Sequence, residues 1–196
     1  MQRDRAADRV SGTTRPHSQR GMRMFLRSRA AAMAMVVATI GTVAISVAPA
    51  SASVSQGYIA GSGTWTDDWG DEGPISASTR SYSNVVAMWQ TILKADGYLA
   101  ASGVDCRFGP ATTAATKRWQ LDRGLVSDGV VGPKTFAKAA TRLRLFEGER
   151  WFYYDGLGTN FAYFGRRADG RWDIPEGPDL EWGMLSYTSA NLSVCS

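Results

Sequence analysis

The sequence predicts an α+β fold, in which a domain of three helices is followed by a small antiparallel β meander. The first observation is a phrase that occurs twice: Asp105-Cys106-Arg107-Phe108-Gly109-Pro110 returns 23 positions later as Asp128-Gly129-Val130-Val131-Gly132-Pro133. The second observation is that apolar residues recur at helical spacing in the segment that precedes the first copy. The third is an aromatic-rich stretch at the C-terminal end of the chain.

The clearest helix is expected over residues 84–96. Asn84 is a good N-cap residue, and Gly97 is a natural stop. Between these two positions, apolar residues recur at helical spacing on one face, with Trp89 at its centre.

Each copy of the repeated phrase is expected to form a turn that leads into a helix. Asp hydrogen-bonds its own backbone in turns and Gly tolerates positive φ, while Pro suits the first position of a helix. One helix is therefore expected from Pro110 to about Asp122. Another should begin at Pro133 and direct Phe136 and Leu143 into the core.

Residues 146–196 hold 11 aromatic residues in 51 positions and predict the meander. Asp-Gly pairs at 155–156 and 169–170 predict hairpin turns between the strands. The aromatic side chains here are expected either to pack in the core or to stack on sugar rings. The expected strands are Arg150–Asp155, Asn160–Gly165, Gly170–Ile174 and Met184–Thr188.

Residues 1–52 have the pattern of a secretory signal peptide. A basic segment precedes an uncharged one, Ala30–Ala48, and a small-residue exit ends at Ala52. We expect cleavage between Ala52 and Ser53; an uncleaved anchor helix is the alternative. The segment holds 8 of the 22 basic and 2 of the 18 acidic residues, so 14 basic and 16 acidic residues remain. This balance excludes a nucleic-acid partner, which needs a basic face.

The residue types that remain after export restrict the chemistry. The single histidine, His17, lies in the signal segment, which argues against imidazole-ligated zinc and histidine-assisted nucleophiles. Cys106 and Cys195 are expected to form a disulfide in an exported protein. Residues 53–81 are rich in Gly, Ser and Asp and predict a solvated lead segment. Their acidic residues lack the spacing of a calcium loop, so no metal or cofactor is expected.

The repeated motifs resemble those of the type-1 peptidoglycan-binding domain over about residues 82–145. This resemblance implies a three-helix, wall-targeting module whose partner is the glycan or stem peptide of bacterial peptidoglycan. We expect a monomer with no membrane attachment after signal cleavage. The residues that carry the resemblance are Trp89-Gln90, Leu93, Gly97, Asp105, Phe108-Gly109-Pro110, Thr113, Trp119-Gln120, Gly124-Leu125, Asp128-Gly129 and Val131-Gly132-Pro133-Lys134-Thr135.

The resemblance also implies a ligand site near the two repeated turns, with Tyr98, Asp105, Arg107 and Asp128 as its candidate residues. Backbone N–H groups at the helix starts could bind a carboxylate there. For both aspartates the alternative role is to cap their own turn. Cys106 stands where the family's first Asp-Gly has its glycine. If that position requires positive φ, the cysteine is strained, and a disulfide could compensate.

These observations predict a secreted, non-catalytic protein that binds bacterial cell-wall peptidoglycan. One alternative is a peptidoglycan hydrolase using Glu147 and Asp155, because residues 146–158 resemble the start of phage-type lysozymes. That resemblance is interrupted from Asn160 onward, and few residues remain for the rest of such a fold. A third possibility is an extracellular interaction or inhibitor protein on the same scaffold.

Overall fold

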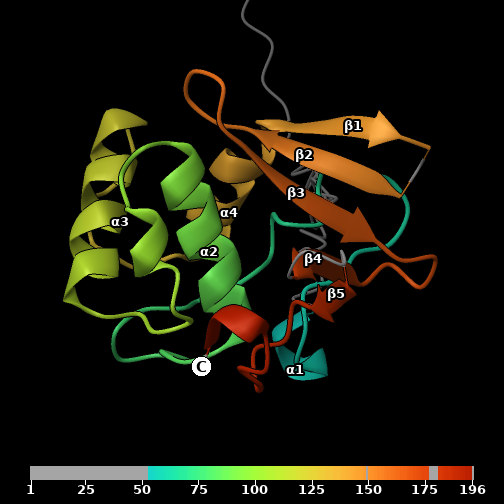
Figure 1. Cartoon of the computed structure of the whole chain (residues 1–196), viewed down its shortest axis with the longest axis horizontal. Helices are drawn as coiled ribbons and strands as arrows, with labels where there is room; N and C mark the ends of the chain where they lie inside the picture. The colour runs from blue at the N-terminus through green and yellow to red at the C-terminus, as the bar shows by residue number, and fades with distance from the viewer. Residues whose placement is uncertain (1–52, 149, 177–180, 196) are drawn as a thin grey trace, which may run out of the picture. The chain divides into compact units, whose positions relative to one another are not determined.

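The computed structural model describes residues 53–148, 150–176 and 181–195, and its helices and antiparallel sheet give the predicted α+β class (Figure 1). The expected signal peptide, with Ala52 at its cleavage site, lies outside these residues. Within them, no helix is long and apolar enough to cross a membrane. The elements are α1 (Ser53–Gln56), α2 (Asn84–Ala95), η1 (Ala101–Gly103), α3 (Pro110–Asp122), α4 (Pro133–Ala140), β1 (Leu143–Glu147), β2 (Trp151–Asp155), β3 (Phe161–Arg166), β4 (Trp172–Glu176), β5 (Glu181–Met184) and η2 (Ser193–Cys195).

The helices begin at the residues that local chemistry favours, with one correction. Pro110 and Pro133 occupy the first helical positions of α3 and α4, as predicted. The N-cap of α2 is Ser83 rather than Asn84, because the Ser83 side chain accepts a hydrogen bond from the N–H of Val86. Asn84 is buried and donates instead to the backbone oxygen of Met184, so it fastens the start of α2 to the C-terminal segment.

Leu143 is buried as expected, but it lies in a strand and not in the last helix. Helix α4 ends at Ala140, and β1 begins at Leu143 after two intervening residues, ahead of the expected boundary at residue 146. In β1, Leu143 pairs with Tyr154 of β2. Pairing with β2 therefore overrides the helical spacing that Leu143 shares with Phe136.

The five strands pair antiparallel in the order in which they follow one another, β1-β2-β3-β4-β5. Alternate residues of β2 and β3 point to opposite faces, so Phe152, Tyr154 and Phe164 are buried on the inner face. The last two strands differ from their predicted ranges. Strand β5 ends at Met184, where Met184–Thr188 was expected to form a strand, and the following Ser186 only forms an isolated bridge with Tyr58.

The lead segment is not solvated as its composition predicts. Trp69 is fully buried, with its ring centroid 5.4 Å from that of Phe164 and 5.3 Å from that of Trp172. The large rings on the inner face of the sheet must be covered, and this segment covers them. Composition missed this burial because the covering residues are isolated among Gly, Ser and Asp.

The acidic residues of the lead segment are used to hold it to the sheet. Asp68 accepts hydrogen bonds from Arg166 Nε (2.6 Å) and Trp172 Nε1 (2.8 Å), while the hydroxyl of Tyr187 donates to Glu72 (2.6 Å). Burial raises the pKa of Asp68 above its usual range, although Arg166 opposes the shift. In the described part of the chain, no group of three or more His, Cys, Asp or Glu residues is arranged to hold a metal ion.

Asp96 joins the helices to the sheet. Its carboxylate, fully buried after the last residue of α2, accepts from Trp119 Nε1 of α3 (2.7 Å) and from the Tyr154 hydroxyl of β2 (2.6 Å). Arg123 and Arg142 form ion pairs with the same carboxylate. Burial raises the pKa of Tyr154, and the hydrogen bond to Asp96 raises it further. One carboxylate thus fixes α2, α3, the segment after α4 and β2 together.

Substitutions at this junction should distinguish the contribution of its hydrogen bonds to stability from the contribution of its charge. Tyr154→Phe keeps the ring but removes the hydroxyl, so we expect the free energy of unfolding to fall by about 1–2 kcal/mol. Asp96→Asn should cost more, about 3 kcal/mol, because it leaves two arginines without a carboxylate. Urea denaturation measures both changes. The control is Tyr153→Phe on the outer face, expected to stay within about 0.5 kcal/mol. Equal losses in Tyr154→Phe and Tyr153→Phe would contradict the assignment.

Candidate functional site

The first repeated turn is organised by a buried glutamine of α2. Gln90 Oε1 accepts from the N–H groups of Asp105 (3.0 Å) and Cys106 (2.9 Å). Its Nε2 donates to Asp105 Oδ1 (2.8 Å), Arg107 O (2.9 Å) and Thr112 Oγ1 (3.0 Å). A side-chain amide therefore supplies the partners that this irregular backbone would otherwise lack.

The second turn is built in the same way around Gln120 of α3. Gln120 Oε1 accepts from the N–H of Gly129 (2.9 Å), and Nε2 donates to Asp128 Oδ1 (2.9 Å), Val130 O (2.9 Å) and Thr135 Oγ1 (3.2 Å). The duplication seen in the sequence is thus a duplication of hydrogen bonds. Sequence reasoning noted both aromatic-Gln pairs but assigned them no role, because only the folded chain brings each glutamine to its turn.

Asp105 and Asp128 take the structural role that the sequence left open. The Oδ1 atom of each accepts from the N–H two residues onward, Arg107 (2.9 Å) and Val130 (2.8 Å). Both aspartates are exposed, and within the described residues no hydrogen bond to Oδ2 of either is formed. Each side chain thus closes its turn with one oxygen, and its contact with a ligand stays a prediction.

Cys106 occupies a left-handed backbone position, like the glycine of the second turn with which it aligns. Its φ is +63°, and that of the equivalent Gly129 is +78°. Cys106 forms the expected disulfide with Cys195, 89 residues away, with a Cα–Cα distance of 5.1 Å. The bond fastens the first turn to η2, while the second turn has glycine and no such tie.

Arg107 is exposed, and its guanidinium carbon lies 4.3 Å from the ring centroid of Tyr82. The ring is 43% exposed, and its hydroxyl donates to the backbone oxygen of Cys195 (2.9 Å). The disulfide and this hydrogen bond hold the stacked pair in place. The sequence analysis predicted Arg107 as a candidate ligand-binding residue but did not include Tyr82, because no local sequence signal marks it.

Tyr98 does not share a cleft with Arg107, contrary to the prediction. Its hydroxyl donates to Asp122 Oδ2 (2.6 Å) at the last residue of α3, whereas Arg107 precedes the first residue of that helix. The 13 residues of α3 separate the two by about 20 Å. Burial raises the pKa of Tyr98, and its bond to Asp122 raises it further. Tyr98 instead lines a cavity of about 420 Å³ with Asp122, Arg123, Lys138, Thr141, Arg142 and Leu157.

A second cleft, of about 310 Å³, lies between α2 and the sheet. Lys94 of α2 and Glu176 of β4 give it charges of both signs, and Phe161 and Tyr163 of β3 add aromatic walls. Glu176 Oε2 also accepts from the N–H of Ser193 (2.7 Å), so the C-terminal segment closes one side.

The strand register separates the backbones of Glu147 and Asp155, the two residues of the hydrolase alternative. Glu147 of β1 lies opposite Trp151, at one end of β2, and Asp155 lies at the other end. Four residues of strand separate these backbone positions by roughly 13 Å. This is a separation of backbone positions, and the hydrolase alternative stays a prediction.

The left-handed position of Cys106 gives a testable difference between two disulfide-free variants. We expect Cys106→Ser with Cys195→Ser to lower the free energy of unfolding by about 4 kcal/mol. Cys106→Gly with Cys195→Ser should recover on the order of 1 kcal/mol, because glycine adopts positive φ without a Cβ clash. Urea denaturation of both variants measures this difference. A serine variant as stable as the glycine variant would contradict the backbone argument.

Comparison with known proteins gives a family match for the segment that holds the two turns. Residues 82–138 match the family model of the putative peptidoglycan binding domain, which confirms the predicted resemblance. A zinc D-Ala-D-Ala carboxypeptidase of Streptomyces albus G is 36% identical over 104 residues, which cover 53% of this chain and 38% of the relative. An uncharacterized protein of Bacillus subtilis (strain 168), FadG, is 45% identical over 65 residues, 33% of this chain and 11% of that protein. The chain thus spans well under half of either relative. No solved structure matches it.

Proposed function

We propose that this protein is secreted and binds bacterial cell-wall peptidoglycan without cutting it. The observation that carries the proposal is the match of residues 82–138 to a peptidoglycan-binding family, across the segment that holds both glutamine-centred turns. The carboxypeptidase relative is named for action on D-Ala-D-Ala, a component of wall peptides, which supports the same setting.

The first turn is the better candidate for contact with a charged wall peptide. The 23-residue repeat places Val130 where the first turn has Arg107, so only the first turn offers a guanidinium. Arginine binds carboxylates with two parallel N–H donors, and Tyr82 restricts its rotation. Asp105 Oδ2 lies on the same turn and offers an acceptor for peptide amides. Together these groups match the alternating carboxylates and amides of a stem peptide.

A non-catalytic role is supported by the structural use of five of the described acidic residues. Asp68, Asp96 and Asp173 are buried in ion pairs with arginines, and Asp105 and Asp128 close turns. Both cysteines form the disulfide, and the one histidine of the chain, His17, lies in the expected signal segment. These side chains offer neither an imidazole ligand nor a histidine base.

Sedimentation with purified sacculi tests the binding proposal. The wild-type protein should pellet with sacculi, and Arg107→Ala should weaken binding roughly tenfold, the effect of losing one charge-assisted contact. The matched control is Arg118→Ala, which removes an exposed arginine from α3 and should bind as wild type.

Three results would contradict this proposal. Wild-type protein that stays in the supernatant would exclude wall binding, and capture of a protein partner instead would favour an interaction protein. An equal loss in Arg118→Ala would indicate non-specific charge attraction. Release of reducing ends by wild type, abolished in Glu147→Gln, would show a hydrolase.

Export is tested separately, by the mass of the protein recovered from culture medium. We expect a chain that begins at Ser53, because the uncharged segment and the small residues before it fit signal peptidase. The mass should also show both thiols joined. Recovery of residues 1–52 on a membrane-bound product would favour the anchor alternative.

A further inference from the structure

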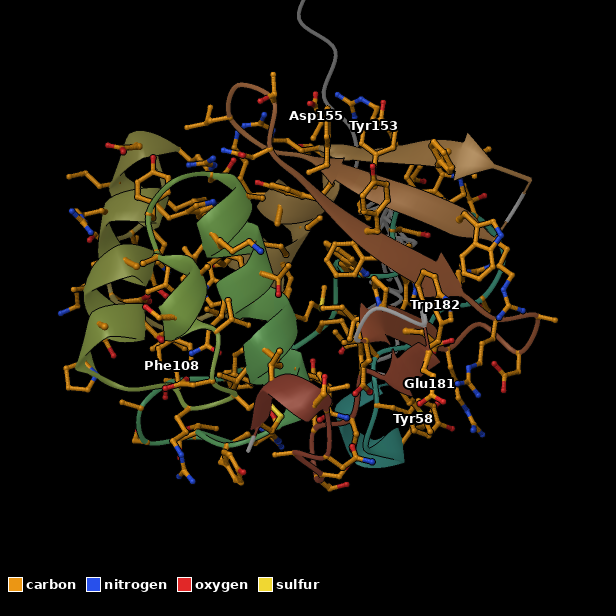
Figure 2. The ribbon with its side chains drawn as sticks, in the orientation of Figure 1. Tyr58, Phe108, Tyr153, Asp155, Glu181 and Trp182 are labelled. Atoms are coloured by element: carbon orange, nitrogen blue, oxygen red, sulfur yellow. A yellow bond between two sulfur atoms is a disulfide. The ribbon has the colours of Figure 1, made fainter. Side chains whose placement is uncertain are left out.

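Aromatic side chains line the outer face of the sheet, which points away from the hydrophobic core. In the described residues, six rings lie on or beside this face: Phe146, Trp151, Tyr153, Phe161, Tyr163 and Trp182. Phe146 is 63% exposed and Tyr163 is 48% exposed. Figure 2 labels Tyr153 on β2 and Trp182 on β5 among these rings. Exposed apolar surface of this extent marks a binding site more often than a structural role.

The rings are held in two groups by contacts with one another. Trp151 and Trp182 stack with centroids 4.4 Å apart and lie over Gly165 of β3. A Cβ at Gly165 would come within 3.1 Å of the Trp151 ring and 3.2 Å of the Trp182 ring, so a side chain at this position would crowd both rings. The second group joins Tyr153 to Phe161 and Phe146 to Tyr163 by edge-to-face contacts.

Two hollows, which share Phe146 and Tyr163 in their lining, lie along these groups. One groove, of about 430 Å³, is bounded by rings of both groups, including Trp182 and Tyr163. A second, of about 240 Å³, lies within the group of Tyr153. Phe161 and Tyr163 also line the cleft between α2 and the sheet, so the aromatic surface continues to the first helix of the domain that matches the peptidoglycan-binding family.

The chemistry of the face favours a neutral, ring-shaped ligand. The face of an aromatic ring carries partial negative charge and attracts C–H groups, which a pyranose presents on its flat sides. The charged residues around it have both signs: Arg144 pairs with Tyr153, Arg150 lies over Trp151, and Asp155 pairs with Phe161. This mixture does not fit a polyanion, and tyrosine hydroxyls can bond sugar hydroxyls and acetamido groups.

We propose that this aromatic face is a second binding surface, which stacks the N-acetylated sugar rings of the peptidoglycan glycan strand. The identity of the ligand rests on the proposed wall-binding function, while the turn at Arg107 would hold the stem peptide. A protein that engages sugar and peptide at two places gains affinity by avidity. It also binds the polymer in preference to either fragment.

Titration with chitohexaose, a soluble β-linked N-acetylglucosamine hexamer, tests the surface by the change in tryptophan fluorescence. We expect wild type to show saturable binding. Trp182→Ala and Tyr163→Ala should each lower the affinity roughly tenfold or more, the size of effect that loss of an aromatic stacking partner has for other flat rings. Trp182→Phe keeps a flat ring and should bind within a few-fold of wild type. Leu121→Ala and Val126→Ala remove exposed apolar side chains from other surfaces and should bind as wild type.

The possible outcomes separate this inference from the proposed function. Unchanged chitohexaose binding in Trp182→Ala and Tyr163→Ala would overturn the inference. So would sacculus binding by wild type that depends on Arg107 but shows no affinity for chitohexaose, and in that case the proposed function would stand. A wild-type dimer that both substitutions dissociate would assign the face to a second copy of this chain. Tyr163 lies outside the core, so Tyr163→Ala should keep the fold even if Trp182→Ala does not.

Discussion

The arrangement of this protein depends on one buried carboxylate. Asp96 follows α2 and receives hydrogen bonds or ion pairs from α3, from the segment after α4 and from β2. A buried charge of this kind is tolerated only when its partners are complete, so the helices and the sheet must assemble together. The helical domain and the aromatic sheet are therefore not independent modules joined by a linker.

A second constraint acts at the two turns: their irregular backbone needs hydrogen-bond partners. Gln90 and Gln120 meet that need from inside the helical domain, and they leave the outward side of each turn free for contact. The first turn adds the disulfide at Cys106 and the stacked Arg107 and Tyr82. We infer that the duplicated scaffold carries different chemistry at its two copies, with the guanidinium of Arg107 at the first and the aliphatic Val130 in its place at the second.

The two proposed surfaces suit a polymer better than a small ligand. A stem peptide branches from a glycan strand, so a protein that contacts both must present a polar group and an aromatic platform at a fixed separation. The rigid junction at Asp96 supplies that fixed relation between the helical domain and the sheet. Asp68, Asp96 and Asp173 are held in buried ion pairs with arginines, so these three carboxylates serve to hold elements together.

The sequence by itself determined the local elements: the two turns that lead into helices at Pro110 and Pro133, and the aromatic strands on either side of the Asp155-Gly156 pair. Each depends on residues close together in the chain, whose backbone preferences are local. Only the tertiary structure decided that Trp69 is buried and that Leu143 belongs to a strand. It likewise paired Tyr82 with Arg107 and brought Gln90 to the first turn. These outcomes depend on which distant groups meet, and desolvation and hydrogen-bond partners at those contacts outweigh local preference.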